Sequence, residues 1–151
     1  MAPSAQRILD ELGVLAGLGP LPLDADGRLT LAFDGRLEVT LEHEPEDGRL
    51  VLWALLAELG AERPVALLGE LLDANFLWQG TGGATLALEH GSGKVVLSQA
   101  LPIMGLEVTA LQRAIEGFVT AAMHWSRHIA EGGSHESGDT DAPGLHHFVR
   151  A

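Results

Sequence analysis

The feature that most constrains the fold is an uninterrupted run of apolar residues at positions 50–57. It reads Leu-Val-Leu-Trp-Ala-Leu-Leu-Ala. Successive side chains of a β-strand point to opposite faces of the sheet, so a strand built from this run is apolar on both faces. We therefore expect an inner strand that is covered on both sides, by a helix or by a second subunit.

The surrounding segments predict further strands. Apolar and polar residues alternate over residues 29–33 and again over 37–41, which is typical of half-buried strands. Asp34-Gly35 between them predicts a tight hairpin turn. Two more strands are predicted at residues 84–89 and 94–101, joined by a glycine-rich loop. Short hairpin connections of this kind favour antiparallel pairing.

Three segments have helical spacing instead. Apolar residues recur every three or four positions after Ser4, a plausible N-cap, until Gly19-Pro20 ends the helix. A second helix is expected at residues 65–76, beginning next to Pro64. The third spans residues 107–131, where one apolar seam continues at steps of three and four. Its members are Leu111, Ile115, Phe118, Ala122, Trp125 and Ile129.

The element order α-β-β-β-α-β-β-α predicts the α+β class, with a twisted, mostly antiparallel sheet of about five strands and three helices. With 151 residues the chain has the length of one domain. We place that domain at residues 1–131. Residues 132–151 are rich in Gly, Ser, His and acidic residues, and we expect them to form a flexible tail.

Charge and composition exclude several functions. Nine basic and 21 acidic residues give a net charge of −12 at pH 7. Such a field repels phosphate backbones and anionic lipid headgroups, so neither nucleic acid nor membrane is an expected partner. Cysteine is absent, which excludes disulfides and thiolate chemistry. We find no signal peptide and no membrane span, and expect a soluble, cytoplasmic protein.

Motifs that could carry chemistry are few. Gly80-Thr81-Gly82-Gly83 lacks the lysine of a phosphate-binding loop and is followed by a strand pattern, so we interpret it as a turn. His124 and His128 have the spacing of metal ligands on a helix, but no HExxH pattern accompanies them. We interpret them as solvated or edge-packed side chains. No nucleophile elbow is present. We expect no enzyme activity, no metal and no cofactor.

The informative anomaly is an excess of apolar residues. The second helix is apolar over a wide stripe, and Phe76-Leu77-Trp78 follows directly after it. Five strands and three helices do not offer enough cover for both faces of every element. Surplus apolar surface is typical of a binding protein. A self-association interface and a groove for an extended client segment are the two uses that we consider.

In these features the chain resembles the class I type III secretion chaperones, the family typified by the intimin-receptor (Tir) chaperone. The resemblance covers residues 5–131 and depends on the order and spacing of five motifs. They are Leu21-Pro22-Leu23-Asp24-Ala25-Asp26-Gly27, Leu71-Leu72-Asp73-Ala74-Asn75-Phe76, Thr81-Gly82-Gly83-Ala84-Thr85-Leu86-Ala87-Leu88, Val95-Val96-Leu97-Ser98-Gln99-Ala100-Leu101-Pro102, and Ile115-Glu116-Gly117-Phe118-Val119 with Trp125.

The resemblance implies a homodimeric chaperone that holds the N-terminal region of a secreted effector in extended form and keeps it competent for secretion. The second helix and the strand after it would supply the dimer contact, for which we name Leu67, Leu68, Leu71, Leu72, Phe76 and Trp78. The first helix and the early strands would bind the client, through Ile8, Leu9, Leu12, Leu15, Leu29, Leu31 and Phe33. The secretion ATPase is a further candidate partner.

Two alternatives remain at this point. A regulatory chaperone of the same fold would bind an anti-activator of secretion genes, and only the identity of the bound protein would reveal it. A small α+β hydrolase or ligand-binding domain would use the apolar excess as a closed pocket lined with convergent polar groups.

Overall fold

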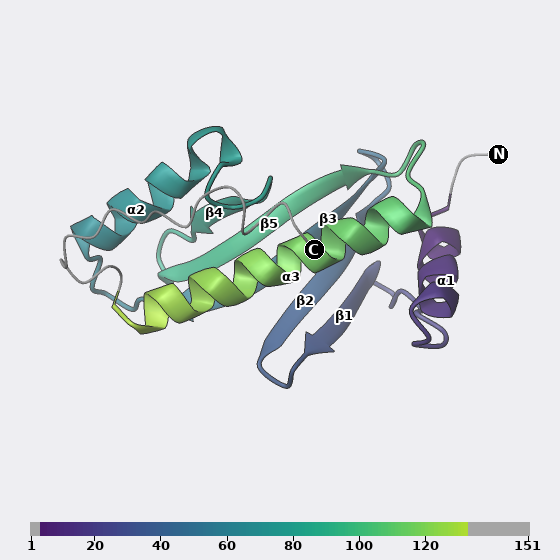
Figure 1. Ribbon diagram of the computed structural model, residues 1–151, viewed down its shortest axis with the longest axis horizontal. Coiled ribbons are helices and arrows are strands. Elements are labelled where there is room, and N and C mark those ends of the chain that lie inside the picture. Colours follow the sequence, from purple (N-terminus) through teal and green to yellow (C-terminus); the bar gives the residue numbers. More distant parts are fainter. Residues whose placement is uncertain (1–3, 133–151) are drawn as a thin grey trace.

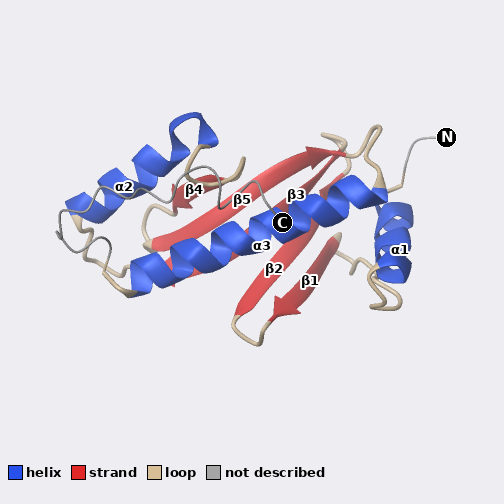
Figure 2. Cartoon of the chain, in the orientation of Figure 1, coloured by secondary structure: helices blue, strands red, loops and turns tan. Residues whose placement is uncertain are grey.

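The computed structural model describes residues 4–132 and confirms the predicted α+β class and element order. Figure 1 labels the elements along the chain, and Figure 2 shows the helices and strands in the same orientation. The elements are α1 (Ala5–Leu15), β1 (Arg28–Phe33), β2 (Leu37–Glu44), β3 (Arg49–Glu58), α2 (Val65–Asn75), the 3₁₀ turn η1 (Phe76–Trp78), β4 (Thr85–Leu88), β5 (Lys94–Pro102) and α3 (Val108–Ala130).

The strands form one sheet in the order β1-β2-β3-β5-β4, and every neighbouring pair is antiparallel. β1, β2 and β3 follow one another through short turns. The first turn uses Asp34 and Gly35 at positive φ angles of 50° and 63°, as a tight hairpin requires. β5 pairs with β3 across the intervening α2–β4 segment. β1 and β4 are consequently the two edge strands.

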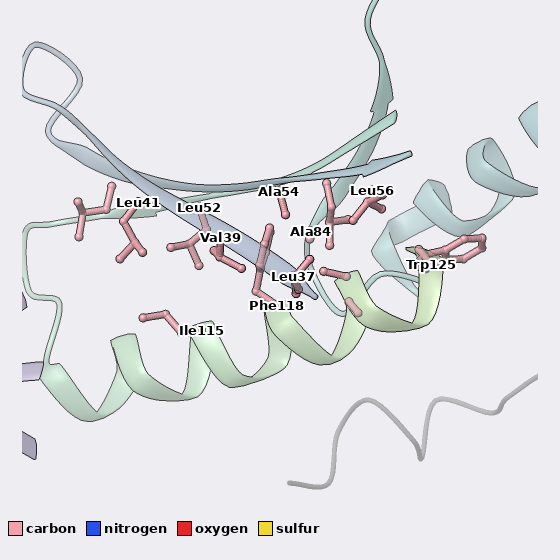
Figure 3. Close-up of a cluster of buried hydrophobic side chains, with 14 of the residues drawn as sticks. Leu37, Val39, Leu41, Leu52, Ala54, Leu56, Ala84, Ile115, Phe118 and Trp125 are labelled. Atoms are coloured by element: carbon pink, nitrogen blue, oxygen red, sulfur yellow. The ribbon is translucent and has the colours of Figure 1, made fainter. Parts of the chain in front are cut away.

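α3 crosses one face of the sheet, while α1 and α2 lie towards opposite ends of it (Figure 1). Between sheet and helix lies the core, where Phe118 of α3 is buried beside Val39 and Leu52 (Figure 3). All six members of the predicted helical seam are buried, so the apolar period of α3 is confirmed. One continuous stripe on a long helix therefore holds the sheet from one side.

The other face of the sheet is incompletely covered. On β3, Leu50, Leu52 and Ala54 are fully buried under α3, whereas Trp53 is half-buried and Leu55 is exposed. A hollow of about 440 Å³ opens on this second face beside Trp53 and Leu55. The prediction of an inner strand is confirmed, but the described residues cover only one of its two apolar faces.

The helix and strand boundaries lie close to those predicted, with one informative difference after the second helix. α2 ends at Asn75, and the chain then tightens into η1 rather than continuing to Phe76. The predicted tail lies outside the described residues except for Gly132. None of the helices between residues 4 and 132 combines the length and apolar character needed to cross a membrane.

Candidate binding surfaces

Alternate residues of β1 direct their backbone N–H and C=O groups away from β2, towards the open edge of the sheet. Arg28, its first residue, turns both backbone groups away from β2: its N–H donates to Asp24 Oδ1, and its carbonyl accepts from Asp24 N–H, each at 2.9 Å. Outward and inward residues alternate along an antiparallel strand. Thr30 and Ala32 therefore also direct their N–H and C=O groups outward, and among the described residues no backbone group bonds with these outward groups.

Apolar side chains accompany this open edge. Leu29, Leu31 and Phe33 of β1 are half-buried and pack against the core from the margin of the sheet. Their partners in the register are core residues of β2. An added strand could therefore use both the free backbone groups of β1 and the exposed portion of these side chains, the combination that strand addition requires.

Most of the apolar residues of α1 that were predicted to bind the client are buried. Ile8, Leu9 and Leu12 are buried by their own chain, and Leu12 is only 3% exposed. The reason is that α1 packs against α3, which takes up the apolar face of the helix. Leu15, at the C-terminal end of α1, is 49% exposed. Among the residues predicted to bind the client, Leu15 and the three apolar residues of β1 are therefore the ones that remain at least partly exposed.

α2 divides its apolar residues between two sides. Leu67 and Leu71 face the core and are buried, and Leu68 is half-buried. Leu72 is 71% exposed and Phe76 is 66% exposed. The predicted dimer residues thus fall into two groups, of which the buried pair is already used within the chain.

The exposed group continues through η1. Leu77 and Trp78 are exposed and adopt positive φ angles of 50° and 55°. Bulky residues rarely adopt this conformation, and such strain is concentrated at functional sites. Trp78 Nε1 donates to Thr85 Oγ1 at 3.1 Å, which links the turn to β4. We call Leu72, Phe76, Leu77 and Trp78 the α2 patch. Leu77 is not among the predicted dimer residues, although it lies between two of them, Phe76 and Trp78.

A shallow groove of about 240 Å³ lies beside this patch, between α2 and β4. The helix lines it with Leu68, Leu71, Leu72 and Asn75, and the strand lines it with Leu86, Ala87 and Leu88. Because its walls are almost entirely aliphatic, water finds few hydrogen-bond partners there, whereas burial of an apolar side chain would be favourable.

The histidine pair on α3 has a structural explanation. His128 Nε2 shares a hydrogen bond with Glu70 Oε2 of α2. The His124 ring stacks on that of His128 at a centroid distance of 6.2 Å and meets Trp125 edge-on. Burial lowers the pKa of His124, and the neighbouring His128 and Arg127 lower it further. Among residues 4–132 no three His, Asp or Glu side chains are placed to hold a metal ion.

The glycine-rich loop at residues 80–83 is a turn fastened to the core. Trp125 Nε1 donates to Gly80 O at 2.9 Å, and the buried Thr81 hydroxyl donates to Ala84 O. A Cβ at Gly80 would lie 2.8 Å from the Ala74 Cα, so only glycine fits this close approach. The loop joins α2 to β4 and positions the α2 patch.

An open sheet edge, a half-covered sheet face and an exposed apolar patch together define a protein-binding module. The chain belongs to the Tir chaperone protein (CesT) family, whose family model matches residues 7–126. The resemblance seen in the sequence motifs is thereby confirmed. A search of curated protein sequences returned no match.

Solved structures share the fold. A chain of the ExsC–ExsE complex superposes with a TM-score of 0.70 at 24% identity, covering 84% of this chain and 94% of that one. The structure of the Yersinia pestis type III secretion chaperone SycH, in complex with a stable fragment of YscM2, superposes with a TM-score of 0.64 at 21% identity. The match covers 80% of this chain and 98% of that one. A chain of the HopA1–SchA chaperone–effector complex superposes with a TM-score of 0.62 at 24% identity, covering 81% of this chain and 89% of that one. At such identities the likeness is one of fold.

Proposed function

We propose that this chain is a type III secretion chaperone that holds the N-terminal region of an effector in extended form. Family membership and the likeness to chaperones solved with bound proteins support this proposal. The observation that carries it is the β1 edge, where the outward backbone groups of Thr30 and Ala32 lie beside half-buried apolar side chains.

Energetic magnitudes indicate how such a client would be held. Ordering an extended segment costs about 1–2 kcal/mol per residue, whereas each backbone hydrogen bond returns only about 0.5–1.5 kcal/mol net. Burial of apolar surface contributes roughly 25 cal/mol per Å². Strand addition therefore needs apolar side chains as well. Leu29, Leu31 and Phe33 on one face of β1, and the hollow beside Trp53 on the other, are suited to receive them.

The hollow is prepared for such contact. Trp53 Nε1 donates to Glu42 Oε2 at 3.2 Å, and Arg28 Nε lies 3.1 Å from the same oxygen. These contacts satisfy the polar end of the indole and fix the ring against the sheet. A fixed aromatic ring with a satisfied N–H can accept an apolar client side chain without new ordering costs.

We further propose that two copies associate through the α2 patch and the adjoining α2–β4 groove. A two-fold axis would place the same patch on itself, so that Leu72 or Phe76 of each copy enters the groove of the other. This arrangement leaves both β1 edges accessible to clients. The domain at residues 1–131 would act in the bacterial cytoplasm by binding rather than by catalysis. Contact with the secretion ATPase remains a prediction of the resemblance alone.

A proline substitution tests the client site. Ala32→Pro removes the outward N–H from β1 without removing a bond to β2, because proline is tolerated where the N–H of an edge strand faces away from the sheet. In a pull-down from the native cytosol, we expect wild type to retain one dominant secreted protein through its N-terminal region, and Ala32→Pro to lose it. Ala32→Ser keeps the N–H and should retain the client.

Equal retention by all three proteins would contradict strand addition at β1. The identity of the captured protein also separates the two chaperone readings. An exported effector would support the main proposal, and an anti-activator of secretion genes would identify the regulatory alternative.

A further inference from the structure

The second edge of the sheet is closed from within the chain. Leu86 of β4 directs its backbone N–H and C=O groups away from β5, and both groups bond to the side chain of Asn75. Leu86 N–H donates to Asn75 Oδ1 at 2.8 Å, and Asn75 Nδ2 donates to Leu86 O at 2.8 Å. The chain's single asparagine thus satisfies both outward groups of the central position of this edge.

The asparagine side chain imitates a neighbouring strand. A carboxamide offers one acceptor and one donor, which is what a residue of a paired strand offers at this position. The Thr81 hydroxyl donates a hydrogen bond to the carbonyl of Ala84, just before β4 begins. β4 itself has only four residues, Thr85–Leu88. Few outward groups therefore remain for an incoming strand.

We propose that Asn75 closes the β4 edge against pairing with a second copy of this chain, so that the sheet keeps a single strand-accepting edge at β1. The assignment of β1 to the client rests on the proposed function, but the closure of β4 does not.

Closure of the β4 edge matters because the exposed α2 patch lies next to it. A sheet with two accepting edges could pair head to tail, β4 of one copy with β1 of the next, and such a contact generates open-ended filaments. The α2 patch, with Leu72 and Phe76 exposed next to β4, would hold a second copy close to this edge. An apolar patch beside an open edge favours aggregation. Asn75 limits association there to side-chain contact.

The test is the size of assemblies formed by Asn75→Ala. We expect the Leu86 amide to exchange with solvent about tenfold faster, because its acceptor is gone. We also expect species larger than those of wild type that grow with protein concentration in sedimentation velocity. The comparison is made with wild type, whatever its oligomeric state. Because Asn75 also lines the α2–β4 groove of the proposed dimer, the double variant described next separates strand pairing from an altered groove contact. No client is needed, so a failure of the client proposal leaves the result unaffected.

The double variant Asn75→Ala/Ala32→Pro identifies the partner edge. Because Ala32→Pro blocks β1, open-ended growth should stop. Continued growth in the double variant would overturn head-to-tail pairing. Gln79→Ala removes an exposed carboxamide from the segment between α2 and β4 and should leave assembly unchanged.

Asn75→Asp serves if the alanine variant does not fold. It keeps the acceptor for Leu86 N–H but loses the donor to Leu86 O, and we expect weaker growth of the same kind. Wild-type assembly size in every folded variant at position 75, together with faster exchange at Leu86, would show that Asn75 only fastens α2 to β4, and would overturn the proposal.

Discussion

The two short helices of equal length, α1 and α2, treat their apolar residues in opposite ways. α1 is amphipathic, and its apolar face is buried against α3. α2 is apolar on more than one side, so Leu67 and Leu71 fill the core while Leu72 remains exposed. An amphipathic helix needs one partner surface, and a helix that is apolar on more than one side needs a second. In our proposal, α1 therefore serves the fold alone, whereas α2 serves both the fold and the dimer interface.

The largest effect should come from charging the buried side of α1. Leu12→Asp places a carboxylate without a partner in the core, and we expect a loss of about 3–5 kcal/mol in the free energy of unfolding. Urea denaturation measures it. Leu15→Asp, three residues further on and half-exposed, is the matched control and should change stability little. Similar stability of both variants would show that α1 is not part of the core.

A smaller effect on stability, and a larger one on assembly, should come from α2. Leu72→Glu adds charge to an exposed position, so we expect the fold to keep its stability within about 0.5 kcal/mol. In light scattering we expect wild type to be the proposed homodimer at micromolar concentration, and Leu72→Glu to be a monomer. Val14→Glu, an exposed apolar residue of α1, should leave the dimer intact. Dissociation by both variants, or by neither, would contradict the assignment of the interface to α2.

The smallest effect should be a pH dependence confined to α2. α2 is tied to α3 by Glu70 and His128, with His124 stacked beside them. Because the folded chain lowers the pKa of His124, the folded state binds its proton less readily than the unfolded state. Stability is therefore retained above the ordinary pKa of 6.5 and declines as the pH falls below it.

Hydrogen exchange at pH 7 and pH 5.5 should reveal this dependence as faster opening of α2 amides relative to those of α1. His124→Gln should remove the difference. His90→Gln, on an exposed turn, should not alter it. Equal acceleration of α1 and α2 in wild type would show that the histidine cluster has no local effect on α2.

The fold could be predicted because its determinants are local. Alternation over residues 29–33 and 37–41, the Asp34-Gly35 turn and the seam of α3 each report secondary structure within a few residues. The motif resemblance then added the architecture. Sheet order depends on distant pairings instead, such as Glu58 with Lys94, for which local pattern gives no signal.

The candidate site was predictable only in part. Leucines of α1 and α2 have the same chemistry in the sequence, and their burial depends on how each helix packs, which is a tertiary property. Asn75 lies in one of the five motifs of the family resemblance, yet its contact with Leu86 joins two elements across a turn. A lone asparagine at a helix end is normally interpreted as a cap, so no local signal indicated its contact with a strand edge.

The pairing of β3 with β5 has a consequence during synthesis. Glu58 and Lys94 are 36 positions apart, the shortest separation in that ladder. At about 5–20 residues per second, β5 follows β3 from the ribosome by roughly 2–7 seconds. Throughout that interval the apolar strand β3 can pair with β2 on one side, while its other edge still lacks its partner β5. A protein proposed to shield the unfolded chains of others is thus itself, during its synthesis, a nascent chain with an unpaired apolar strand edge.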